Sequence, residues 1–147
     1  MELSLFIAAL VFALDRAAKV LWHSADFTVV PGILGIRGTQ NTGMAFGLLG
    51  DHPYLLAILA SAILILLFLY LVKKHLPVYG QIGFGLVLGG AAGNLFDRLV
   101  YGYVIDMLEP LFMHLFIFNP ADAAVVCGIF LLGFYFLFGK EHPDEPA

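Results

Sequence analysis

The stretch from Tyr54 to Val72 contains no charged residue. Its length is close to the roughly 20 apolar residues that a helix needs to cross the hydrocarbon core of a bilayer. Because no water reaches backbone groups at that depth, such a segment must be a helix that satisfies its own hydrogen bonds. The run therefore predicts a membrane protein. The whole chain agrees, since it is 61% hydrophobic and only 12% charged.

Three further apolar segments have a similar length, at about residues 3–21, 78–99 and 119–138. Together with residues 54–72 they predict an all-α polytopic membrane protein with four transmembrane helices, in one integral membrane domain covering residues 1–147. We interpret the first segment as a retained helix, because no basic residue precedes it and no small-residue cleavage site follows it.

An even number of spans places both chain ends on the side of the turn that holds Lys73 and Lys74. Lys140 also falls on that side, whereas the long first loop carries Arg37. Cytoplasmic loops are enriched in Lys and Arg, so we expect both termini, including the polar tail 139–147, in the cytoplasm.

Residues 26–49 differ from the apolar segments. Two short strand-like runs, 27–30 and 33–36, flank a Pro31-Gly32 turn signal, and they predict two strands. Hydrocarbon does not tolerate open sheet edges, so we expect this strand-bearing segment at the interface or against the bundle. Residues 100–117 are apolar and aromatic, which suits a segment that lies in the interface.

The composition argues against several partners. A net charge of −4 without a basic stripe excludes nucleic acid. The single cysteine cannot form an internal disulfide. The five histidines are scattered, and neither CxxC nor HExxH spacing occurs, so we expect no metal site.

Four aspartates lie inside or against the apolar segments: Asp15, Asp97, Asp106 and Asp122. A charge near the bilayer centre costs at least about 2.5–3.5 kcal/mol, so intramembrane carboxylates indicate a function by default. Asp106 has no cation near it in the sequence, which makes it the better candidate. Two neighbouring carboxylates cannot both ionise cheaply, so one keeps a proton. Such a pair can activate water and hydrogen-bond a carbonyl oxygen.

The third apolar segment ends on residues 93–98, Gly-Asn-Leu-Phe-Asp-Arg. Asn94, Asp97 and Arg98 project from neighbouring parts of one helical face. Arg98 keeps its charge, so it needs a carboxylate or another polar partner at this depth. The alternative is a self-satisfied helix end in which Asp97 pairs with Arg98.

Residues 118–122 have the pattern of a helix start. Asn119 is a favoured N-cap, and Pro120 suits the first helical position. Asp122 would then face the helix N–H groups and the positive end of the helix dipole. It either caps the helix and nothing more, or is held ionised and aimed at an active site. Residues 41–47, NTGMAFG, suggest a tight turn with backbone exposed to a ligand.

Two patterns bear on helix packing. Asp15 and Lys19 are spaced i, i+4 with the acid first, the better orientation for an ion pair, and serve either as a structural strut or as support for a site. Gly85, Gly89 and Gly93 form a small-residue face that lets another helix approach closely.

Taken together, five motifs resemble those of the bacterial lipoprotein signal peptidases, the signal peptidase II family. Residues 15–19 and 41–47 look like the first and second motifs of that family. Residues 93–98 look like the third, and residues 104–106 and 118–122 look like the fourth and fifth. The match covers nearly the whole chain.

The resemblance implies an intramembrane aspartyl endopeptidase with Asp106 and Asp122 as its catalytic dyad. It implies prolipoprotein substrates that carry diacylglyceryl on a cysteine and are cut just before that cysteine. It places the enzyme in the bacterial inner membrane, among membrane lipid, with the active site toward the periplasm and no cofactor. A substrate that enters sideways between helices needs no partner chain, so we expect a monomer. The supporting residues implied by the resemblance are Asn41, Gly43, Asn94, Arg98, Asn119, Asp15, Lys19 and Asp97.

By the same resemblance, residues 26–49 correspond to a periplasmic β-cradle and residues 100–117 to an interfacial flap helix. The alternative function is a small ion- or proton-coupled transporter that uses intramembrane carboxylates. A transporter would be expected to hold its acids near the bilayer midplane, whereas these aspartates fall at span ends or in loops on one face. Their placement favours the peptidase.

Overall fold

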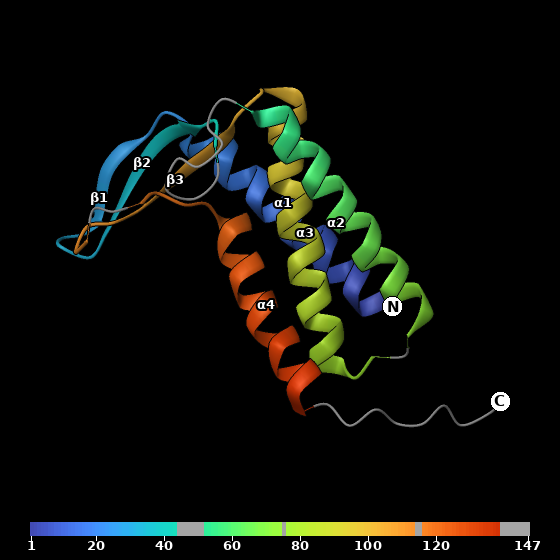
Figure 1. Cartoon of the computed structure of the whole chain (residues 1–147). Coiled ribbons are helices and arrows are strands. Elements are labelled where there is room, and N and C mark those ends of the chain that lie inside the picture. The colour runs from blue at the N-terminus through green and yellow to red at the C-terminus, as the bar shows by residue number, and fades with distance from the viewer. Residues whose placement is uncertain (44–51, 75, 114–115, 139–147) are drawn as a thin grey trace, which may run out of the picture.

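The computed structural model describes residues 1–43, 52–74, 76–113 and 116–138. A small sheet with the strand order β1-β2-β3 lies at one end of a bundle of helices (Figure 1). In chain order the elements are α1 (Glu2–Trp22), β1 (Asp26–Val30), β2 (Leu34–Asn41), α2 (Pro53–Lys73), α3 (Val78–Val100), β3 (Val104–Pro110) and α4 (Pro120–Phe138). The helices lie within a few residues of the apolar segments that the sequence predicts.

Helix α3 is the centre of the bundle and packs against α1, α2 and α4. Its glycines permit this close packing, as the small-residue face predicts. A Cβ added to Gly85 would lie 2.7 Å from the Ser4 carbonyl oxygen of α1, and one added to Gly89 would lie 2.6 Å from the Ala8 carbonyl oxygen. On its other side, Gly90 contacts the backbone of α4 at Ala121. Glycine is therefore needed where α3 meets both neighbours.

Large apolar side chains cover the outward faces of the bundle, for example Ile58, Leu66 and Phe130. Exposed apolar surface of this extent marks contact with a membrane rather than with water. Among the described helices, two are long and apolar enough to cross a membrane, over Tyr54–Lys73 and Pro120–Phe138. Membrane crossing by α1 and α3 stays a prediction.

The two strands predicted on either side of the Pro31-Gly32 turn are confirmed. β1 and β2 pair antiparallel, and Gly32 lies in the turn with a φ of 71°, in the left-handed region that favours glycine. β2 continues beyond the predicted residues 33–36 and ends at Asn41. It does so because its polar second half pairs with β3, where Asn41 lies opposite Val104.

The expected flap helix over residues 100–117 is wrong for the described part of that segment. Residues 104–110 form β3, which pairs antiparallel with β2 from Val104 to Pro110. The segment is rich in β-branched and apolar residues, and most of its side chains are buried. Backbone pairing with β2 decides the structure here, and an interfacial helix would leave β2 without that partner.

We predict that Gly89→Ala destabilises the protein by about 1–3 kcal/mol, because the new methyl group would clash with the backbone of α1. A side chain could relieve such a clash by changing its rotamer, but the helix backbone cannot. Thermal unfolding in detergent measures the change. Gly133→Ala is the matched control, since nothing lies within 4 Å of a Cβ at that position. Alanine there should leave the midpoint unchanged or slightly raised. Equal midpoints for the two variants would contradict the packing argument.

Candidate active site

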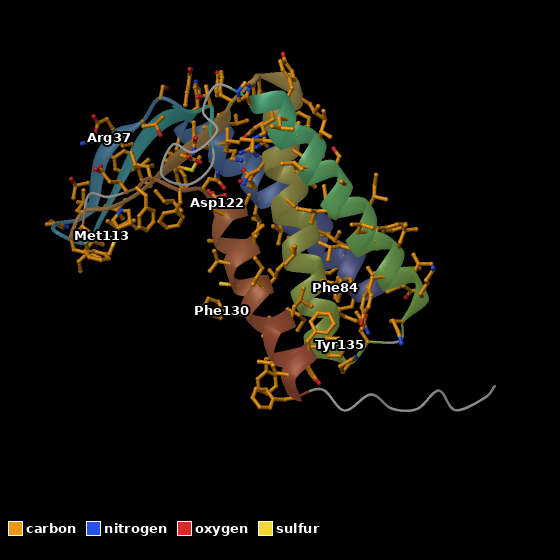
Figure 2. All side chains as sticks on the ribbon, viewed as in Figure 1. Arg37, Phe84, Met113, Asp122, Phe130 and Tyr135 are labelled. Carbon is orange, nitrogen blue, oxygen red and sulfur yellow. The ribbon has the colours of Figure 1, made fainter. Side chains whose placement is uncertain are left out.

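A continuous set of hydrogen bonds and ion pairs lies where α1 and α3 end, where α4 begins and where β3 passes. Figure 2 shows Asp122 at this point, at the end of α4 that faces the sheet. Every site residue that the sequence predicts belongs to this set, together with one that it does not. Its side chains are those of Asp15, Arg16, Lys19, Asn41, Asn94, Asp97, Arg98, Asp106, Asn119 and Asp122, with Gly43 taking part through its backbone.

The start of α4 holds the Asp122 carboxylate, as the predicted helix-start pattern implies. The Asp122 backbone N–H donates to Asn119 Oδ1 at 2.8 Å, and the Asn119 backbone N–H donates to Asp122 Oδ2 at 3.3 Å. This reciprocal pair caps the helix. The other carboxylate oxygen, Oδ1, accepts a 2.7 Å hydrogen bond from Asn94 Nδ2 of α3. Asp122 therefore takes part in the helix cap and also binds a side chain of α3.

The Asp106 side chain is buried on β3 and is held by two amides. Its Oδ1 accepts from Asn119 Nδ2 at 2.6 Å, and its Oδ2 accepts from Asn41 Nδ2 at 2.9 Å. Asn119 thus contacts Asp106 and Asp122, and it brings together two carboxylates that are far apart in the sequence. We refer to Asp106 and Asp122 as the carboxylate pair.

Burial raises the pKa of Asp106 to about 6, because the charged form loses its contact with water. Hydrogen bonds from Asn41 and Asn119 oppose this change by stabilising the ionised form, and the nearby charge of Asp122 adds to it. The balance lets Asp106 hold a proton at a pH where an exposed carboxyl group would have lost it.

The Lys19 ammonium lies fully buried beside the carboxylate pair. Its Nζ is 3.0 Å from Asp15 Oδ2, 2.7 Å from Asp97 Oδ2 and 2.9 Å from Asn94 Oδ1. These contacts match the three N–H donors of a lysine. The predicted pair of Asp15 with Lys19 is confirmed, and Asn94 connects it to the Asp122 carboxylate.

Arg16 completes this group, and the sequence analysis does not single it out. Its Nη1 is 2.6 Å from Asp97 Oδ1, and its Nη2 is 2.9 Å from Asp15 Oδ2. The alternative in which Asp97 simply pairs with the adjacent Arg98 is therefore not what forms. The available signal was a cation beside Asp15 in an otherwise apolar stretch. We call Asp15, Arg16, Lys19 and Asp97 the ion network.

Backbone groups tie the ion network to the rest of the site. The Ala121 N–H of α4 donates to Asp15 Oδ1 at 3.1 Å, and the Ile105 N–H of β3 donates to Asp97 Oδ2 at 3.2 Å. Gly93 makes room for the Asp15 carboxylate, since a Cβ there would lie 2.6 Å from Asp15 Oδ2. The network thus positions both elements that carry the carboxylate pair.

Arg98 links the site to the segment before α2. Its Nη2 donates to the Gly43 carbonyl oxygen at 3.1 Å, and its Nη1 donates to the Asn94 carbonyl oxygen at 3.4 Å. The Gly43 N–H in turn donates to Asn41 Oδ1 at 3.0 Å, which orients the amide that contacts Asp106. Residues 44–47 of the predicted 41–47 motif lie outside the described residues.

The charges of the site fit a pair that holds one proton. Four aspartates face three cations, which are Arg16, Lys19 and Arg98. One proton on the carboxylate pair makes the buried assembly neutral, the form that an apolar bundle accommodates at least cost. A pair in this state offers both a base and an acid, as aspartic peptidases require. Within the described residues, no group of three or more His, Cys, Asp or Glu residues could hold a metal ion.

Comparison with known proteins identifies the family. The family described as signal peptidase (SPase) II matches residues 7–138. The lipoprotein signal peptidase of Solibacter usitatus is 39% identical over 139 residues, covering 86% of this chain and 85% of the relative. That of Enterococcus faecalis is 33% identical over 149 residues, covering 95% of this chain and 90% of the relative. A solved bacterial membrane enzyme superposes with a TM-score of 0.87 at 27% identity, covering 100% of this chain and 94% of that one.

A carboxylate pair at the end of an apolar helical bundle, with Asp106 buried and Asp122 half-buried, is the arrangement expected of an aspartic peptidase that works at a membrane. The chain belongs to the signal peptidase II family, which confirms the resemblance drawn from its five motifs. It is an aspartic peptidase of a bacterial membrane, and this assignment is favoured over the transporter alternative.

We predict that Asp106→Asn changes the pH dependence of stability. Ionised Asp106 is penalised in the folded protein, so its contribution to stability falls as the pH rises from 3.8 to about 6 and is constant above that range. The shift corresponds to roughly 3 kcal/mol. The unfolding midpoint of the variant, relative to the parent, should therefore be higher at about pH 8 than at about pH 4. A difference that is the same at both pH values would contradict the burial argument.

Proposed function

We propose that this protein removes the signal peptide from prolipoproteins that carry diacylglyceryl on a cysteine, cutting just before that cysteine, with Asp106 and Asp122 as the catalytic dyad. The observation that carries the proposal is the contact of Asn119 with both carboxylates, at 2.6 Å for Asp106 and 3.3 Å for Asp122. The relatives from Solibacter usitatus and Enterococcus faecalis are lipoprotein signal peptidases, which supports this substrate class.

The dyad would act with one proton shared between its carboxyl groups. The ionised carboxylate takes a proton from water as the water oxygen attacks the scissile carbonyl carbon. The protonated carboxyl donates its proton to the carbonyl oxygen, which gives a neutral tetrahedral intermediate. As that intermediate collapses, one of its hydroxyl groups gives its proton to the ionised carboxylate and becomes the carbonyl of the new carboxyl end. The C–N bond breaks, the leaving nitrogen takes the proton of the other carboxyl group, and the dyad again holds one proton. In these steps the dyad carboxyl groups move the protons and water is the nucleophile, so the reaction needs no cofactor.

Asn94, Asn119 and Asn41 would keep the dyad in place during these steps. Each donates an amide N–H to a carboxylate oxygen, at distances between 2.6 and 2.9 Å. Fixed donors of this kind reduce the reorganisation that the reaction requires. Arg98 lies within electrostatic range of both carboxylates and would hold the Gly43 carbonyl and the local backbone at the edge of the site.

All four helices would cross the bacterial inner membrane, with both termini in the cytoplasm and the site toward the periplasm. The start of α1, the end of α4 and the connection from α2 to α3 lie at the end of the bundle opposite the sheet (Figure 1). Lys73 ends α2 and Lys74 follows it, so both lie at this end of the bundle, and the preference for positive charge in the cytoplasm favours this orientation. The sheet and the site would then lie near the outer membrane surface.

A site at the end of the bundle suits a substrate anchored in lipid. The acyl chains of diacylglyceryl stay in the hydrocarbon while the modified cysteine lies at the interface, level with the site. The substrate would approach sideways through the surrounding membrane lipid, past outward-facing side chains such as Ile58 and Phe130. The hydrogen-bonded site is assembled from one chain, which supports a monomer.

Asp106→Asn and Asp122→Asn should each lower the cleavage rate by about a hundredfold or more, because an amide can neither accept the proton from water nor share one with its partner. Turnover of purified protein on diacylglyceryl-modified prolipoprotein in detergent measures the loss. Asp26→Asn is the matched control, since the Asp26 side chain is 79% exposed on β1 and should leave turnover unchanged. Near-normal turnover in either dyad variant would contradict the assignment.

Arg98→Lys should reduce cleavage about tenfold while the protein still folds, because a single ammonium cannot replace both guanidinium contacts, to Gly43 and to Asn94. The same turnover assay, with an unfolding curve, separates lost activity from lost folding. The control is Arg37→Lys, a half-exposed arginine on β2. A parent-like rate for Arg98→Lys would mean that the fork geometry of Arg98 has no part in the reaction.

A further inference from the structure

Arg16 joins two carboxylates that belong to different helices. Its Nη1 lies 2.6 Å from Asp97 Oδ1 of α3, and its Nη2 lies 2.9 Å from Asp15 Oδ2 of α1. Its guanidinium carbon also lies 4.9 Å from the ring centre of Phe96, a cation–π contact on the outer side of the ion network. A planar fork can hold two carboxylates at once, which a point charge cannot do.

Without the guanidinium, Asp15 and Asp97 would face one ammonium, that of Lys19. Both carboxylates are fully buried, so an unpaired charge there is strongly unfavourable. Hydrogen bonds to ionised acceptors are about twice as strong as those to neutral ones. The contact that Lys19 would give up is therefore the one to its neutral acceptor, Asn94 Oδ1 at 2.9 Å.

That contact sets the direction of the Asn94 amide. Asn94 Oδ1 faces Lys19 and also accepts from Asn119 Nδ2 at 3.2 Å, while Asn94 Nδ2 donates to Asp122 Oδ1 at 2.7 Å. With its oxygen held by a cation, the amide can only present its N–H to Asp122. If Lys19 turns away, the longer contact from Asn119 Nδ2 is left to hold that oxygen, and the amide is aimed less firmly at the Asp122 carboxylate.

We propose that Arg16 is a positioning residue for the reaction. By pairing with Asp15 and Asp97 it leaves one N–H of Lys19 for Asn94, and Asn94 then aims its own N–H at Asp122. Arg16 acts through this chain of contacts and does not touch the dyad. The inference rests on the proposed function of Asp122.

The kinetic test compares the parent with Arg16→Gln, using diacylglyceryl-modified prolipoprotein in detergent. We expect kcat to fall at least about tenfold, because the geometry of the dyad is disturbed. KM should stay within about twofold, because Arg16 makes no contact that holds substrate. Arg37→Gln is the matched control and should leave both constants unchanged. A parent-like kcat, or a loss that appears in KM instead, would overturn the proposal.

A compensating substitution separates positioning from a general need for Arg16 in folding. Asp97→Asn, added to Arg16→Gln, removes the carboxylate that would be left without a partner, and Lys19 can again serve Asp15 and Asn94. The combined variant should regain most of the lost kcat. If Arg16→Gln alone does not fold, the combined variant carries the test, and a folded but inactive combined variant overturns the proposal.

The side-chain amide NMR signal of Asn94 provides a readout that does not depend on activity. In detergent micelles it is assigned by its absence from the spectrum of Asn94→Asp. Arg16→Gln should shift this signal, and the added Asp97→Asn should move it back toward the parent position. An unmoved signal overturns the proposal even if kcat falls. Failure of the proposed function would show differently, as a parent that cleaves no prolipoprotein.

Discussion

The buried ammonium of Lys19 is the interaction on which the arrangement of the site depends. It lies within 3.0 Å of oxygens from Asp15, Asp97 and Asn94, which belong to α1 and α3. Removing one partner of a buried charge pair costs about 3–5 kcal/mol, so these helices can meet in only one register. The Ala121 N–H extends the same constraint to α4 through Asp15. The position of the carboxylate pair follows from this register.

Small residues make the buried charges possible. A Cβ at Gly93 would lie 2.6 Å from Asp15 Oδ2, so the glycine that lets α3 approach α1 also leaves room for the carboxylate of the ion network. The absence of a side chain at Gly93 therefore serves both the packing of the helices and the shape of the site. Below the site, the bundle is closed by apolar packing, with Tyr70 stacked on Phe84 at 5.4 Å between ring centres. An apolar base thus supports a polar end in which amides and cations of the same chain contact the four carboxylates.

Local sequence patterns predicted much of this structure, because their causes are local. The apolar run at residues 54–72 has to be a helix, Asn119 has to cap one, and Lys19 lies one turn from Asp15. What the sequence did not predict depends on pairing between distant segments. β3 forms because Val104 and its neighbours meet β2, and no local periodicity records that pairing. The contact of Arg16 with Asp97 likewise arises only once α1 and α3 are packed together.

The intact mass of the products that the purified protein makes from a prolipoprotein, with and without diacylglyceryl on its cysteine, tests the proposed reaction most directly. We expect a mature product that begins with the lipidated cysteine, and no product from the unlipidated chain. Cleavage at another peptide bond, or equal cleavage of both substrates, would contradict the proposed specificity. No cleavage by a well-folded protein would contradict the assignment of Asp106 and Asp122 as a catalytic dyad.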